Sequence, residues 1–150
     1  MKGQISFTVL GMPISQGSMG VNRRTGQLYH VKNAQLAVWR QKVQFGALNT
    51  ARLAGWKLPL NCPLLLSVQF YLARPKRPKF KDYAATKPDV DKLLRAVQDG
   101  LSPRQGGKFT VEDSRFVDSH ATKAYAASNT IGAKNGPRAE ITVIDLSVPF

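Results

Sequence analysis

The sequence predicts an α+β fold in which helices pack on a mixed sheet of about four strands. The chain has 150 residues, 43% of them hydrophobic, which is the size and composition of one ordinary globular domain. Short alternating or apolar stretches typical of strands are interleaved with two longer stretches that repeat apolar residues every three or four positions, as amphipathic helices do. We therefore expect one domain over residues 1–150, with the main elements in the order strand, helix, strand, helix, strand, strand.

The first strand is expected at residues 4–10, where polar and apolar residues alternate and β-branched and aromatic side chains are frequent. Residues 11–26 contain four glycines and predict a long loop whose tip carries Arg23 and Arg24. Residues 27–31 are compatible with a short strand that closes this loop.

The first helix is expected to begin at Asn33, a suitable N-cap residue, and to stop at Gly55. Its apolar positions recur at helical spacing and are Leu36, Trp39, Val43 and Ala47. Residues 64–72 are almost continuously apolar and of strand length, which predicts a central strand buried on both faces.

Residues 73–88 are rich in proline and in basic residues, so no regular structure is expected there. One interpretation is a solvated loop, and the other is an arm that contacts phosphates. The net charge of the chain favours the arm. Its basic residues are Arg74, Lys76, Arg77, Lys79, Lys81 and Lys87.

A second helix is expected after Pro88, and Gly100 and Pro103 with the glycines at 106 and 107 should end it. Its apolar stripe consists of Val90, Leu94, Val97 and Leu101. Two further strands are expected at residues 115–124 and 139–148, separated by an Asn-Gly-Pro turn at residues 135–137.

The formal net charge is +13, from 22 basic and 9 acidic residues. Such a surface attracts polyanions and releases counterions when it binds phosphates. The basic residues are spread along the chain, which favours nucleic acid over a membrane surface as the partner. No apolar run is long enough for a leader peptide or a membrane span, so we expect a cytoplasmic protein. The single cysteine cannot form an intrachain disulfide, and with two histidines it cannot supply a Cys/His zinc site.

The acidic residues are unevenly distributed. Six of the nine fall within thirty positions, and they are Asp89, Asp91, Asp99, Glu112, Asp113 and Asp118. Carboxylates set into a basic surface would repel phosphate unless a cation neutralised them. Mg²⁺ needs only one or two carboxylates together with waters and substrate phosphate oxygens. The pattern therefore predicts a Mg²⁺-dependent enzyme that acts on nucleic-acid phosphodiesters.

Several of these acidic residues are expected to lie on the second helix. Asp91, Arg95 and Asp99 follow one another at i, i+4 steps, and Asp89 stands at the start of the expected helix. In a non-catalytic interpretation Asp89 caps the helix, and the other two aspartates pair with Arg95. In the catalytic interpretation the acidic pair that precedes the next strand, at residues 112–113, comes beside the helix start and completes a metal site.

Three segments resemble the RusA-type Holliday junction resolvases of phages and prophages. Residues 87–101 begin Lys-Pro-Asp-x-Asp and continue as a leucine-rich helix with a further aspartate, and residues 111–117 place an acidic pair before a strand. Residues 7–13 and the loop after them are similar to the first strand and loop of that family. The resemblance implies a RusA-like fold in a bacterial or phage-infected cell, a homodimer, and paired nicks across a four-way DNA junction.

The resemblance also implies roles for individual residues. Asp89, Asp91 and Asp113 would bind Mg²⁺, with Mn²⁺ as a possible substitute, and Asp99 and Glu112 would be supporting carboxylates. The chain departs from the family at Lys92, where asparagine is usual, and at Arg95, where lysine is usual. Arginine stays protonated, so Arg95 is expected to stabilise phosphate charge rather than to transfer a proton.

The function expected from these residues is cleavage of four-way junctions by water attack on DNA phosphodiesters. Two alternatives stay open: a nuclease for flaps or other branched DNA in phage replication or packaging, and a non-catalytic basic DNA-binding protein. Tyr29, Phe80 and Tyr83 lie in basic loops and are candidates for stacking on bases. The residues expected to contact DNA are Arg23, Arg24, Arg74, Lys76, Arg77, Lys79, Lys81, Lys87 and Lys92.

Overall fold

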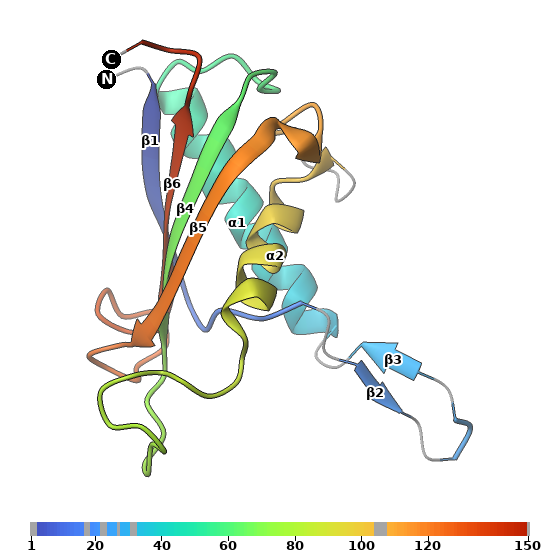
Figure 1. Ribbon diagram of the computed structural model, residues 1–150, viewed down its shortest axis with the longest axis vertical. Helices are drawn as coiled ribbons and strands as arrows, with labels where there is room; N and C mark the ends of the chain where they lie inside the picture. The colour runs from blue at the N-terminus through green and yellow to red at the C-terminus, as the bar shows by residue number, and fades with distance from the viewer. Residues whose placement is uncertain are drawn as a thin grey trace.

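The computed structural model describes residues 3–16, 19–21, 24–26, 28–30, 33–103 and 108–149. It confirms the predicted α+β class, because two helices pack on one face of a four-stranded mixed sheet (Figure 1). The strand order is β1-β6-β4-β5, with β4 and β5 parallel and the other neighbours antiparallel. The elements are β1 Gln4–Leu10, α1 Asn33–Leu53, β4 Leu64–Leu72, α2 Val90–Gly100, β5 Phe116–Tyr125 and β6 Arg138–Asp145.

The interior strand β4 was predicted correctly in position but not in burial. Leu64, Leu66 and every second residue after them are buried, whereas the residues between them are half-buried. The helices cover only the face of the sheet to which the buried set points, so the prediction of a strand buried on both faces was wrong. Ser67 and Gln69 mark the open face and were the signal for this in an otherwise apolar run.

The two helices meet at a close crossing. All four predicted apolar positions of α1 are buried. A Cβ atom at Gly100 would lie 3.0 Å from the backbone oxygen of Arg40 and 3.2 Å from the side chain of Val43, so glycine allows α2 to approach α1 closely. On α2, Val97 is buried as predicted, but Val90 and Leu94 are half-buried because the helix turns Leu93, Ala96 and Val97 into the core.

Two segments outside this body complete the description. Strands β2, Met19–Val21, and β3, Leu28–His30, form a separate antiparallel two-stranded sheet. The first of these strands falls inside the stretch that was expected to be all loop, and the second confirms the short strand expected after it. Residues 73–88 contain no helix or strand, as predicted. None of the helices in the described part of the chain is long and apolar enough to cross a membrane.

Candidate functional site

The start of α2 presents Asp89 in an unusual role for an N-cap residue. Its backbone is extended, with φ −69° and ψ 140°, and its carbonyl accepts the hydrogen bond of Leu93 N at 3.1 Å. Its carboxylate makes no capping hydrogen bond, is 54% exposed, and lies 3.7 Å from Lys92 Nζ. An aspartate at this position ordinarily uses its side chain to cap the helix. The Asp89 carboxylate therefore faces solvent at the positive end of the helix dipole.

The ion pairs expected from the non-catalytic interpretation do not form around Arg95. Asp91 and Arg95 are both exposed, and neither has an ion pair or side-chain hydrogen bond with any residue that the structure describes. Asp99 pairs with a different cation, because Arg40 Nη2 lies 3.4 Å from Asp99 Oδ2. The N-terminal half of α2 thus presents two carboxylates and an arginine to solvent.

Arg40 is a residue whose importance the sequence interpretation missed. Its Nη2 donates to Gln16 Oε1 at 2.6 Å as well as facing Asp99, and Gln16 N donates to the backbone oxygen of Lys92 at 3.1 Å. These contacts tie the loop after β1 to both helices. A signal was present in the sequence, since Arg40 falls four positions after Leu36, within the apolar stripe of α1.

The two groups of predicted carboxylates lie at opposite ends of α2. β5 runs antiparallel to the helix, because Gln98 Nε2 donates to Ser119 Oγ at 3.1 Å while Lys123 Nζ donates to the Pro88 oxygen at 2.8 Å. The residues that precede β5 therefore lie beyond the C-terminal end of α2, with Asp113 at the start of the 3-10 helix η2, Asp113–Arg115. At 1.5 Å per residue, α2 is about 16 Å long.

This placement separates the predicted metal ligands within one chain. Asp89 and Asp91 are neighbours at the helix start, whereas Asp113 is a helix length away (Figure 1). In the described part of the chain, no group of three or more His, Cys, Asp or Glu residues is arranged to hold a metal ion. Glu112 is paired with Arg115 at 3.3 Å, and Arg115 Nε also donates to Asn61 Oδ1 at 2.9 Å.

The basic loop of residues 73–88 is anchored at Arg74. The Arg74 backbone N donates to Asn129 Oδ1 at 2.8 Å, and its Nη2 donates to the Lys81 oxygen at 2.6 Å. Its guanidinium carbon also lies 5.1 Å from the centre of the Tyr125 ring. These contacts give Arg74 a role in holding the loop's shape, which the prediction of a phosphate contact did not anticipate.

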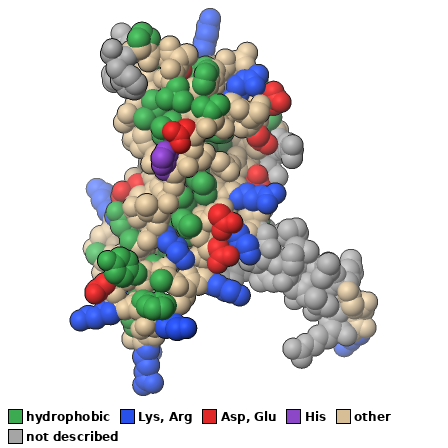
Figure 2. All heavy atoms as spheres, viewed as in Figure 1, with side chains coloured by type: hydrophobic (Ala, Val, Ile, Leu, Met, Phe, Trp, Pro, Cys, Tyr) green, Lys and Arg blue, Asp and Glu red, His purple; other side chains and the backbone are tan. Residues whose placement is uncertain are grey.

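The rest of this loop is displayed to solvent. Phe80 is 46% and Tyr83 75% exposed. Figure 2 shows basic side chains gathered around the same end of the molecule. The predicted DNA contacts there are exposed, namely Lys76, Arg77, Lys79, Lys81 and Lys87.

The remaining predicted DNA contacts differ in their surroundings. Arg24 is exposed, whereas Arg23 and the side chain of Tyr29 lie outside the described residues. Lys92 is the ion-pair partner of Asp89. Lys123 is a second residue that the sequence interpretation missed. It extends from β5 to the loop before α2, where its Nζ donates to the Thr86 oxygen at 2.6 Å. Its sequence signal was a lysine on the strand face that points to the helices.

The donor set at the helix start suits Mg²⁺ in part. Two solvent-facing carboxylates match the one or two that this ion usually takes, with waters and phosphate oxygens as its other ligands. Lys92 lies 3.7 Å from Asp89, and the exposed Arg95 follows Asp91 by one helical turn, so both would balance the charge of a phosphate that approached the helix start. A third carboxylate, if one is used, has to come from outside this end of the chain.

A family model and two curated relatives match most of this chain. The family model described as endodeoxyribonuclease RusA matches residues 11–144. A crossover junction endodeoxyribonuclease rusA of Lactococcus phage r1t is 26% identical over 131 aligned residues, which cover 87% of this chain and 95% of the relative. The uncharacterized protein YqaN of Bacillus subtilis (strain 168) is 27% identical over 157 aligned residues, which cover 95% of this chain and 97% of the relative.

Proposed function

The chain belongs to the RusA endodeoxyribonuclease family, and from that premise we propose that it is a Mg²⁺-dependent endonuclease that resolves four-way DNA junctions by paired nicks. The observation that carries the proposal is the exposed start of α2, where Asp89 and Asp91 are not used in capping or in a helix-surface ion pair with Arg95. Asp91 has no ion-pair partner among the described residues, and Asp89 has only an exposed pair with Lys92 at 3.7 Å, so both carboxylates are accessible to a divalent cation.

Each residue of this surface has a proposed role. Asp89 and Asp91 would hold Mg²⁺, which supplies Lewis-acid charge and makes hydroxide available near neutral pH. Arg95, one helical turn after Asp91, would neutralise the scissile phosphate through its fixed charge. The exposed lysines of the loop at residues 73–88 would contact the DNA backbone, and Phe80 with Tyr83 would stack on bases opened at the branch point.

The distance between the two carboxylate groups supports the proposed homodimer. Asp113 cannot join Asp89 and Asp91 across the length of α2 unless the chain rearranges. A second copy could instead place its own η2 beside the first copy's helix start. We propose that the Asp113 of one protomer completes the site of the other.

Mixing two inactive variants tests this shared site. In a heterodimer of D91N with D113N, shared sites leave one site fully wild-type and the other doubly altered, so one strand of the junction should be nicked. If each site were built within one chain, both sites of the heterodimer would be altered and no nick should appear. Each variant alone serves as the control.

The activity itself is tested with a labelled synthetic four-way junction, incubated with and without Mg²⁺, and with Mn²⁺ in parallel. Paired nicks that require the cation are the expected result. Junction binding without any cleavage would identify a non-catalytic DNA-binding protein. Faster cleavage of flaps or forks than of four-way junctions would favour the branched-DNA nuclease of phage replication or packaging.

A further inference from the structure

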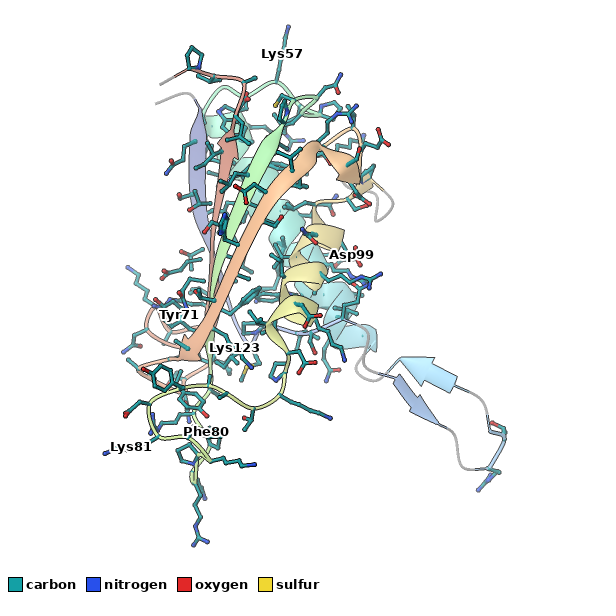
Figure 3. The ribbon with its side chains drawn as sticks, viewed as in Figure 1. Lys57, Tyr71, Phe80, Lys81, Asp99 and Lys123 are labelled. Carbon is teal, nitrogen blue, oxygen red and sulfur yellow. The ribbon has the colours of Figure 1, made fainter. Side chains whose placement is uncertain are left out.

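Lys123 connects the edge strand to the segment that precedes the candidate site. It is aligned with the buried Phe70 of β4, so its side chain lies on the helix-covered face of the sheet. Its Nζ donates to the Thr86 oxygen at 2.6 Å and to the Pro88 oxygen at 2.8 Å. Figure 3 labels Lys123 near the end of β5 that lies beside the start of α2.

The two carbonyl groups that Lys123 holds belong to the residues immediately before Asp89. Residues 73–88 have no helical or strand hydrogen bonds of their own, so contacts of this kind determine their path. Hydrogen bonds from an ammonium group are stronger than those between neutral groups. Half-burial of Lys123 limits competition from water. The direction in which the chain enters α2 therefore depends on Lys123.

This entry direction matters for the Asp89 carboxylate. An aspartate that follows a loop into a helix gains about 1 kcal/mol by turning its side chain onto the free N–H groups of the first turn. Asp89 does not do so, although it occupies the N-cap position. Its carboxylate instead lies 3.7 Å from Lys92 Nζ, on an extended backbone whose preceding peptide groups are held by Lys123.

We propose that Lys123 is a positioning residue for the metal site: by fixing the backbone of residues 86–88, it keeps the Asp89 carboxylate turned to solvent and away from the helix N-terminus. The inference rests on the proposed function, because a solvent-facing Asp89 carboxylate is needed only if it binds the proposed metal ion. It adds a residue from β5 to a site proposed on the start of α2 and on Asp113.

The test compares K123M with K57M. Both substitutions remove one lysine charge, but Lys57 is exposed at the far end of the molecule (Figure 3). Hydrogen exchange over residues 86–92 should be at least several-fold faster in K123M than in K57M, with equal exchange elsewhere. Mn²⁺ affinity, measured by titration without DNA, should fall about 10-fold in K123M, the lower end of the range for residues that orient metal ligands. K123R should recover part of both effects, because a guanidinium also donates to carbonyl groups.

The outcomes separate this proposal from the proposed function. If K123M matches K57M in the exchange of residues 86–92 or in Mn²⁺ affinity, the positioning role is wrong. If the wild-type protein cuts no junction in any divalent cation while K123M still shows both differences, the positioning role holds and the nuclease proposal fails. If K123M melts early, both measurements are made well below its melting transition, where exchange and Mn²⁺ affinity equal to those of K57M would still count against the role.

Discussion

The two ends of α2 use their acidic residues in different ways. At the C-terminal end, Asp99 pairs with Arg40 and nearby Glu112 pairs with Arg115, so these two carboxylates have fixed cations. At the N-terminal end, Asp91 has no ion-pair partner among the described residues, and the Asp89 carboxylate neither caps the helix nor approaches a cation closer than 3.7 Å. Carboxylates with fixed partners hold helices and loops together, whereas those left in solvent at a helix start are available to an exchangeable cation.

Replacing Asp91 should cause the largest loss of junction cleavage. D91N removes the charge but keeps the shape, so we expect junction cleavage in Mg²⁺ to fall at least about 100-fold, on the scale of losing a group that stabilises the transition state. Junction binding without metal should be unchanged or tighter, because a negative charge near phosphate is removed. Single-turnover cleavage and gel-shift titration measure the two effects.

The matched control for D91N is D118N, which removes the same charge from an exposed residue on the open face of β5. D118N should cleave at the wild-type rate. Wild-type cleavage by D91N, or an equal loss in both variants, would show that the start of α2 is not the site.

Arg95 should give the second largest effect. R95Q removes the positive charge beside the proposed metal, and we expect cleavage to fall roughly 10- to 100-fold with little change in thermal stability, since Arg95 has no ion-pair partner among the described residues. R95K restores the charge and should recover most of the rate if charge is what matters. A rate in R95K that exceeds wild type and depends on a pKa near neutral pH would instead indicate proton transfer at this position.

Much of the fold followed from residue patterns because local and long-range preferences agree. The alternation in residues 4–10, the apolar periodicity from Leu36 to Ala47, and the placement of residues 64–72 in the sheet interior were all confirmed. The burial of α2 was partly misplaced, since the stripe that faces the core also depends on the close crossing at Gly100. That crossing is a tertiary feature that periodicity alone does not encode.

The candidate site was less accessible to sequence reasoning than the fold. The clustering of aspartates along the chain suggested one site, but β5 runs back along α2 and leaves Asp113 at the far end. Residues close in sequence can lie at opposite ends of a helix, and the position of Asp113 depends on where β5 begins relative to α2. The hydrogen-bond partners of Arg40 and Lys123 could not be predicted from local sequence patterns either, because each contact joins residues more than 20 positions apart.

D99N should sharpen the comparison by changing stability more than activity. Both partners of the Arg40–Asp99 pair are mostly buried, at 19% and 27% side-chain exposure. Loss of the charge should lower the free energy of unfolding by about 1 kcal/mol after allowance for solvent screening. The sequence interpretation made Asp99 a supporting carboxylate, and its pairing indicates support through helix packing. Cleavage should therefore stay within about threefold of wild type. A large loss of cleavage at unchanged stability would place Asp99 in the metal site.

The smallest effect on cleavage is expected at Asp145, a carboxylate with a structural role far from the helix start. Burial alone would raise the pKa of Asp145, but hydrogen bonds to its Oδ1 from Ser147 N at 2.9 Å and Ser147 Oγ at 2.6 Å lower that pKa overall. Burial, and then the neighbouring Asp145, raises the pKa of the Cys62 thiol to about 11.

Because the Asp145 carboxyl group binds its proton less readily in the folded state, it adds stability above its unfolded pKa near 3.9, and this is lost as the pH falls through the lower folded value. D145N should therefore reduce the free energy of unfolding by about 1 kcal/mol at pH 7, and the difference from wild type should shrink below about pH 4. Urea titrations from pH 3 to pH 8 measure it. A difference that grew on acidification would contradict the assignment, whereas cleavage of junctions by D145N at the wild-type rate would separate this carboxylate from those at the start of α2.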